Sequence, residues 1–186
     1  GAPGLARVVA GDARNLPDVL AATTLGGHPS LAGRVALVLT SPPYGSAAHG
    51  QVTAEGATPV RKRDYRYSAD PGNLAHQPLA ELLDGFGAIL TGAAGLLRPG
   101  GTVAVTTRPF RSGGELVDLP GAVITAAGEA GLVFQDRAVA LLAGLRGTRV
   151  VSRGSFFAMH NTRALQTRGI PAHVVAHEDV LIFTRP

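Results

Sequence analysis

The segment of this chain that is most suited to chemistry is a pair of prolines and a tyrosine that follow an apolar run. Val35–Leu39 is apolar, and after one threonine come Ser41, Pro42, Pro43 and Tyr44. Each proline fixes its φ angle and lacks an amide donor, so the backbone there is a rigid corner with free carbonyl acceptors. Such a corner can accept hydrogen bonds from the exocyclic amine of a planar group while Tyr44 covers the face of that group. The alternative is a rigid surface turn with a tyrosine packed for structure, which the preceding strand makes less favoured.

Basic and aromatic residues alternate in Arg61–Tyr67, within the long polar segment 45–77. This mixture suits contact with phosphate and stacking on bases. A solvated loop is an equally good interpretation of it. The candidate contacts to a phosphate-bearing substrate are Gly45, His49, Arg61, Lys62, Arg63, Tyr65 and Arg108.

Two of these candidates also have ordinary structural explanations. His49 lies in the segment after the proline corner, where a solvated histidine is the favoured interpretation. Arg108 follows an apolar run at the rim where sites of α/β proteins lie. A structural ion pair between Arg108 and Glu115 or Asp118 is slightly favoured over contact with a substrate.

Two further groups of polar residues favour a structural role. His177 and Glu178 resemble a metal-binding or acid–base pair, but adjacent residues of a strand point to opposite faces. Three arginines form either a second phosphate-facing patch or ordinary surface charge, and the second interpretation is preferred. They are Arg146, Arg149 and Arg153.

Composition limits the classes of protein that this chain can represent. Its 186 residues suit one domain with a real core, and its net charge of +4 is compatible with a phosphate-bearing partner or with a soluble enzyme rich in arginine. The absence of cysteine excludes disulfides, thiolate zinc sites and cysteine nucleophiles. No apolar run approaches the length of a membrane span, and no signal peptide is recognisable at the first residue. We therefore expect no membrane and no metal.

Apolar periodicity predicts strands that alternate with helices, which is typical of an α/β domain around a largely parallel sheet. The clearest helix is 78–97, and Pro99-Gly100-Gly101 is expected to stop it. Weaker helices are predicted at 15–31 and at 115–130, the latter kinked by Pro120. The predicted strands are 8–10, 35–39, 102–107, 132–142 and 173–184.

Four segments resemble motifs of S-adenosylmethionine-dependent amino-methyltransferases that act on nucleic acid. Ser41–Tyr44 matches their catalytic signature of Ser, Asn or Asp followed by two prolines and an aromatic residue. Gly11–Arg14 resembles the motif after their third strand, and Leu96–Gly101 resembles their turn from helix to strand. His177–Phe183 is similar to their final hairpin strand. The implied fold is a Rossmann-like methyltransferase sheet.

The resemblance implies transfer of a methyl group from S-adenosyl-L-methionine to an exocyclic amine of a DNA base. N4 of cytosine is favoured by Ser41, and N6 of adenine is also compatible. In this family the serine side chain and the carbonyl of Pro42 hold the amine, and Tyr44 stacks on the base. Asp12 and Ala13 would contact the adenine of the donor, although an aspartate in this setting is nearly as often a turn or cap residue.

The chain departs from the family in one respect. It has no Gly-rich first motif, which in the family holds the methionine end of the donor and lies upstream of the third strand. We therefore interpret residues 1–186 as a single partial methyltransferase domain that begins near the third strand, with 45–77 as a long loop on the substrate side. Residues 7–10 would then lack their neighbours in the sheet and leave an exposed or rearranged edge. We expect the chain alone to bind the donor poorly.

Two alternatives remain at this point. One is an RNA methyltransferase, for example one that acts on guanine N2 of tRNA, although related proteins there carry Asp more often than Ser before the two prolines. The other is a catalytically inactive remnant that still binds nucleic acid. The favoured interpretation is a cytoplasmic DNA methyltransferase, of the kind found in restriction-modification systems, whose partner is DNA.

Overall fold

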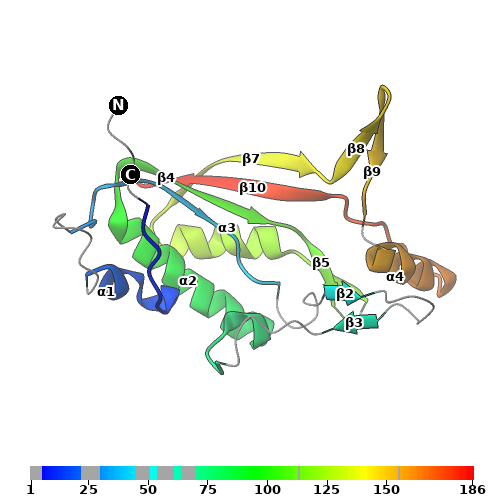
Figure 1. Cartoon of the computed structure of the whole chain (residues 1–186), viewed down its shortest axis with the longest axis horizontal. Coiled ribbons are helices and arrows are strands. Elements are labelled where there is room, and N and C mark those ends of the chain that lie inside the picture. The colour runs from blue at the N-terminus through cyan, green and yellow to red at the C-terminus, as the bar shows by residue number, and fades with distance from the viewer. Residues whose placement is uncertain are drawn as a thin grey trace.

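The computed structural model describes residues 6–21, 30–44, 51–53, 61–63, 70–112, 114–154 and 156–186. At its centre lies a four-stranded sheet with the strand order β1-β4-β10-β7 (Figure 1). The strands are β1 (Val35–Thr40), β4 (Leu97–Thr107), β7 (Val133–Leu141) and β10 (His177–Thr184). The predicted α/β architecture is confirmed.

The expectation of a largely parallel sheet is wrong for the described part of the chain. β1 runs parallel to β4, whereas β10 runs antiparallel to both β4 and β7. A parallel pair needs a crossover that passes over the face of the sheet. Between β7 and β10 the chain instead passes through a hairpin and a helix that lie beyond one end of the sheet (Figure 1), so it returns in the opposite direction.

Helices cover one face of this sheet. α2 (Leu79–Leu96) and α3 (Leu119–Glu129) lie side by side on it, as Figure 1 shows. Side chains of β4 and β10 alternate between the two faces, and those that face the helices are fully buried. The core formed in this way consists of Phe86, Leu90, Leu97, Val103, Val105, Leu119, Val123, Ala127, Leu132, Leu181 and Phe183.

The sequence predicted α2 well because its apolar residues recur at helical spacing. The helix ends at Leu96, and Leu97 already begins β4, so this strand is longer than predicted. Gly101 lies where a side chain would meet the backbone, since a Cβ atom there would lie 2.8 Å from the carbonyl oxygen of Arg98 and 3.0 Å from that of Val35. Gly101 therefore allows β4 to lie closely against β1, whereas the helix ends at Leu96, before the expected stop at Pro99-Gly100-Gly101.

By length and composition α2 is apolar enough to cross a membrane, contrary to the expectation that no run approaches that length. Its buried residues include Phe86 and Leu90, which pack into the core described above, so its length and composition are weak evidence for a membrane span.

The second predicted helix is shorter than expected at its start. Residues Glu115–Val117 form β6, which pairs with β5 (Phe110–Ser112). α3 begins after Asp118, whose Oδ1 accepts a hydrogen bond from the backbone N–H of Gly121 at 3.0 Å. Pro120 lies in the first turn, where its missing N–H removes no intrahelical bond, so the expected kink is absent from α3.

The predicted strand at 8–10 is wrong, because residues 6–10 have no regular structure and Val8 is fully exposed. An isolated apolar tripeptide has no ladder to join, and β1 forms the edge of the sheet as described, with Leu37 and Leu39 exposed. The exposed edge that was expected from missing neighbours of residues 7–10 stays a prediction. Of the predicted helix at 15–31, the described part contains α1 (Leu16–Ala21), preceded by the 3₁₀ turn η1 (Ala13–Asn15), and both contact α2. Residues 22–29 lie outside the described residues.

Several elements were not predicted. Within 45–77 the structure shows β2 (Gln51–Thr53) paired with β3 (Arg61–Arg63), and the 3₁₀ turn η2 (Leu74–His76). Beyond the end of the sheet lie the hairpin of β8 (Ala143–Arg146) and β9 (Arg149–Ser152) and the helix α4 (Phe156–Thr167) (Figure 1). Residues 173–176, expected to be part of the last strand, have no regular structure.

The cap of α3 gives a test of this fold. Asp118→Ala removes the acceptor of the Gly121 N–H, so we expect a loss of about 1 kcal/mol in the free energy of unfolding, measured by urea denaturation. Asp118→Asn keeps an acceptor and should lose clearly less. Equal stability of Asp118→Ala and the unmodified chain would contradict this role.

Candidate active site

The proline corner lies at the C-terminal end of β1, beside a cavity of about 480 Å³. Pro42 is buried, whereas Ser41 is exposed. Burial of the proline holds the corner against the protein and leaves the serine hydroxyl free to meet a ligand. The residues that line this cavity are Leu39, Thr40, Ser41, Tyr44, Ala104, Thr106, Glu178 and Val180.

The strand register explains why these residues come together. Leu39 is opposite Ala104 in the β1–β4 ladder, and Thr106 is opposite Val180 in the β4–β10 ladder. Because side chains alternate along each strand, these residues share the face of the sheet that α2 and α3 do not cover. The cavity is thus built on the open face, at the carboxyl ends of β1 and β4.

Tyr44 lies between solvent and core. Its ring is half-buried and meets Phe110 edge-on, with centroids 6.3 Å apart and an interplanar angle of 76°. The guanidinium carbon of Arg108 lies 5.2 Å from the centroid of the Tyr44 ring. An edge-on aromatic partner and a cation over the ring both hold a tyrosine in a fixed orientation. Tyr44 also packs against the hydrophobic core, so the alternative of a tyrosine packed for structure stays open.

The surroundings of Tyr44 keep its phenol neutral. Burial raises the pKa of Tyr44 above its ordinary value of 10.0, and the negative charges of Glu178 and Asp179 act in the same direction. Arg108 acts in the opposite direction and lowers this pKa. At neutral pH the ring therefore presents an uncharged aromatic face, which suits stacking.

Arg108 does not form the ion pair with Glu115 or Asp118 that the sequence slightly favoured, since the described salt bridges do not include it. It packs over Tyr44 instead, and no motif indicated that contact. Sequence reasoning also missed Glu178 as a lining residue. Alternation along the last strand placed Glu178 and His177 on opposite faces, but only the sheet order shows that the face of Glu178 carries the cavity.

A buried carboxylate supports the start of β10. Asp179 is fully buried, and its Oδ1 accepts a hydrogen bond from Nε of Arg137 at 2.8 Å. Nε2 of His177 lies 3.8 Å from the same oxygen. Asp179 raises the pKa of Arg137 by this hydrogen bond. Opposite Asp179 in the ladder lies Thr107, and neither its hydroxyl nor Oδ2 of Asp179 has a hydrogen-bond partner in the described structure.

Asp12 has a local role in the structure. Its carboxylate caps η1 by accepting from the backbone N–H of Arg14 at 3.0 Å, and it forms an ion pair of 2.6 Å with the Arg14 side chain. These hydrogen bonds hold the pKa of Asp12 below its usual value. Asp12 and Ala13 are not among the residues that line the cavity beside Tyr44. Their predicted contact with a donor adenine stays a prediction.

The remaining candidates are only partly visible. Gly45, His49 and Tyr65 lie outside the described residues. Arg61, Lys62 and Arg63 form the strand β3. Arg146 and Arg149 lie on the β8–β9 hairpin and are exposed. Within the described part of the chain, no group of three or more His, Asp or Glu side chains could hold a metal ion.

The titration of Tyr44 tests its surroundings. The chain has three tyrosines, so the phenolate absorbance of Tyr44 is obtained as the difference between the unmodified chain and Tyr44→Phe. We expect a midpoint above the ordinary value of 10.0 because of burial, and a still higher midpoint in Arg108→Gln, because the cation that favours the phenolate is gone. A midpoint that falls in Arg108→Gln would contradict the described geometry.

No known protein family and no curated protein matches the sequence, whereas solved structures do. TTHA0409 of Thermus thermophilus, named as a candidate DNA modification methylase, aligns with a TM-score of 0.53 and 17% identity over 95% of this chain and 52% of its own. Its complex with S-adenosyl-L-methionine aligns with a TM-score of 0.51 and 18% identity, covering 95% and 54%. PvuII DNA methyltransferase, which is cytosine-N4-specific, aligns with a TM-score of 0.52 and 18% identity over 83% of this chain and 44% of its own. The chain spans about half the length of these proteins, and it has their fold.

Proposed function

We propose that this chain contains the acceptor-binding part of an S-adenosyl-L-methionine-dependent DNA amino-methyltransferase. The observation that carries the proposal is the placement of Ser41 and Tyr44 on a cavity at the carboxyl end of β1. The fold shared with solved DNA methyltransferases, one of them cytosine-N4-specific, supports it. The favoured acceptor is N4 of cytosine, and N6 of adenine is the second.

The exocyclic amine of a base is a poor nucleophile, because its lone pair is delocalised into the ring. Hydrogen bonds from the amine to the Ser41 hydroxyl and the Pro42 carbonyl favour a tetrahedral nitrogen with a localised lone pair. The prolines hold these acceptors without any change in backbone angle. The contribution of the chain is thus positioning and electrostatic preorganisation, without a covalent intermediate.

Tyr44 provides the stacking surface for the base. Its neutral ring is held by Phe110 and Arg108, so little conformational freedom is lost when a base stacks on it. Stacking of a base on an aromatic side chain contributes roughly 1–3 kcal/mol. A base in a duplex cannot reach such a site, so the acceptor must be flipped out or single-stranded.

The cavity also fits the charge of the donor. When bound, S-adenosyl-L-methionine supplies an electrophilic methyl group on a positively charged sulfur. Glu178 brings a carboxylate to this cavity, and a carboxylate attracts a cation. Asp12 and Ala13 remain the proposed contacts to the adenine of the donor, and further residues for its methionine end are expected in the remainder of a longer protein.

Labelled donor tests the proposal directly. The 186-residue chain, and the full open reading frame that contains it, are incubated with S-adenosyl-L-methionine carrying a tritiated methyl group and with duplex DNA, single-stranded DNA or tRNA. We expect label in DNA with the full protein and much less with the chain alone, and N4-methylcytosine as the product identified by mass spectrometry. Label in tRNA alone would assign the chain to RNA methylation, and binding of DNA with no label in any substrate would indicate an inactive remnant.

Tyr44 gives a sharper test of the acceptor site in the full protein. Removing its ring in Tyr44→Ala should lower kcat/KM for DNA by about 5- to 150-fold, the equivalent of the stacking energy, and leave the affinity for the donor nearly unchanged. Tyr44→Phe retains the ring and serves as the control, so it should keep most of the activity. Unchanged turnover in Tyr44→Ala would remove this residue from the mechanism.

A further inference from the structure

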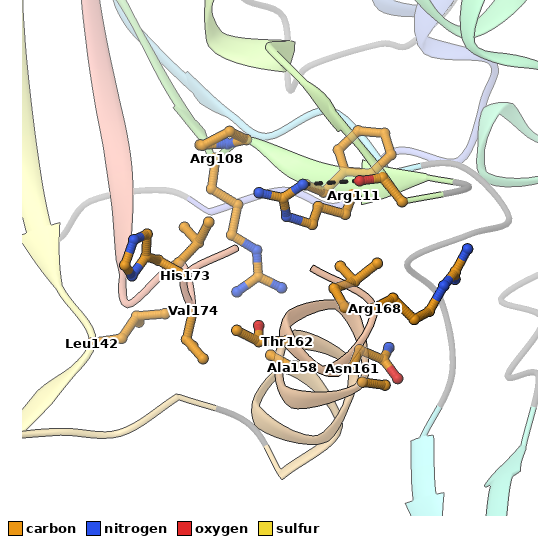
Figure 2. A pocket seen from close by; sticks show the side chains of 15 residues that line it. Arg108, Arg111, Leu142, Ala158, Asn161, Thr162, Arg168, His173 and Val174 are labelled. Carbon is orange, nitrogen blue, oxygen red and sulfur yellow. Dashed lines mark hydrogen bonds between the residues drawn. The ribbon is translucent and has the colours of Figure 1, made fainter. Parts of the chain in front are cut away.

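A second cavity of about 440 Å³ lies beside the proposed active site. Its walls are β5, α4 and the segment 171–175. Figure 2 shows Arg108 and Arg111 on one side, Thr162 of α4 opposite them, and His173 at one end. None of the sequence motifs indicated this cavity, because α4 and its neighbouring segments were not predicted.

The charged residues that line this cavity are all cationic. They are Arg108, Arg111 and Arg168, and no Asp or Glu is among the lining residues. In Figure 2 the guanidinium of Arg108 points into the space between Thr162 and His173. Among the described residues Arg108 has no carboxylate partner. Several cations without an anion in a partly enclosed space produce a positive potential that attracts an anionic ligand.

Arg111 is anchored so that its charge is fixed at the wall. Its Nη1 donates to the carbonyl oxygen of Gly114 at 2.9 Å and its Nη2 to that of Pro171 at 3.5 Å. These bonds use carbonyl groups, so they orient the guanidinium without neutralising it. A fixed guanidinium beside a second one is the arrangement that proteins use to bind phosphate oxygens.

Besides Asn161 and Thr162, the rest of the lining is apolar and suits the sugar rather than a free ion. Phe110, Leu142, Leu165 and Val174 all face this cavity. A site for inorganic phosphate needs only a small polar pocket, whereas this volume accommodates a larger group with an anionic and an apolar part. A sugar-phosphate unit of a nucleic acid has both parts.

Arg108 connects this cavity to Tyr44. Its guanidinium carbon is 5.2 Å from the centre of the Tyr44 ring, and Phe110, which also lines the cavity, touches the edge of that ring. A ligand held by Arg108 is therefore next to the place where a base stacks. The two cavities therefore adjoin where Arg108 and Phe110 contact Tyr44.

We propose that the cavity between β5, α4 and residues 171–175 binds a backbone phosphodiester and its sugar, adjoining the base presented at Tyr44, with Arg108 and Arg111 as the phosphate contacts. This inference rests on the proposed function, since it assumes that a base is held at Tyr44. Phosphate contacts of this kind fix the register of a strand without reading its sequence.

The test measures binding of a fluorescent single-stranded oligodeoxynucleotide to the chain over a range of salt concentrations. Arg108→Gln removes the cation, Arg108→Lys keeps the charge without the planar fork, and Arg163→Gln makes the same charge change on an exposed position of α4 that does not line the cavity. Each variant is compared on the normal strand and on strands in which one linkage next to the target cytosine is a neutral methylphosphonate. Thermal melts confirm that each variant is folded.

We expect Arg108→Gln to weaken binding by about tenfold and to reduce the slope of log K against log salt by about 0.7, the value for one contact to a single strand. One neutral linkage should weaken binding by the unmodified chain and have little further effect on Arg108→Gln, because both changes remove the same contact. Arg108→Lys should recover part of the loss, and Arg163→Gln should bind nearly as the unmodified chain does. Additive effects at every linkage, or equal losses in Arg108→Gln and Arg163→Gln, would overturn the proposal.

Two further strands separate this inference from the proposed function. A strand with an abasic site in place of the target removes the base and leaves its phosphates, and Tyr44→Ala removes the stacking surface. If these changes have no effect while the coupling between Arg108 and the neutral linkage persists, the phosphate site stands and base binding at Tyr44 fails. If the base matters and the coupling is absent, the phosphate site fails alone.

A competition experiment tests whether the cavity binds a small anion instead. Inorganic phosphate is added at a concentration where chloride of equal ionic strength has no effect. Displacement of the strand under these conditions would assign the cavity to a small anion and overturn the proposal.

Discussion

The arrangement of the site depends on the position of β4 between β1 and β10. Tyr44 follows β1, Arg108 follows β4 directly, and Glu178 lies at the start of β10, which runs in the opposite direction. One end of the sheet therefore collects residues that are far apart in the chain. A shift of one residue in the β1–β4 or the β4–β10 ladder would turn these side chains to the other face of the sheet. The buried residues of β4 and β10 fix the register, so they also determine which side chains face the cavity.

Packing of the core and construction of the site use opposite faces of the same strands. Val103 and Val105 point toward α2 and α3, while Ala104 and Thr106 point to the open face. The small side chain of Ala104 leaves space for the cavity next to Leu39. This division lets the helices stabilise the strands while the other face stays available to a ligand, and it also leaves Leu37 and Leu39 of the edge strand exposed.

The parts of the fold that the sequence predicted well carry a strong and local apolar pattern. α2 has many apolar residues at helical spacing, and β1 is a short apolar run that ends in a turn signal. α4 escaped prediction because its sequence mixes apolar and polar residues without the strong pattern of α2, and most of its described side chains are exposed. The strands of the β5–β6 and β8–β9 hairpins are only three or four residues long, which is too short for a reliable period. The strand expected at 8–10 failed because an extended segment is stabilised by neighbours that a local pattern cannot supply.

By itself the sequence determined the proline corner, because proline restricts its own φ angle whatever surrounds it, and it determined that an apolar strand leads into that corner. Only the tertiary structure decided what the corner faces. Arg108 over Tyr44, Glu178 in the cavity, and the arginine-lined space against α4 all join residues distant in the chain. Such contacts depend on sheet order and register, which arise from packing across the whole domain and leave no mark on the spacing of residues within any one segment.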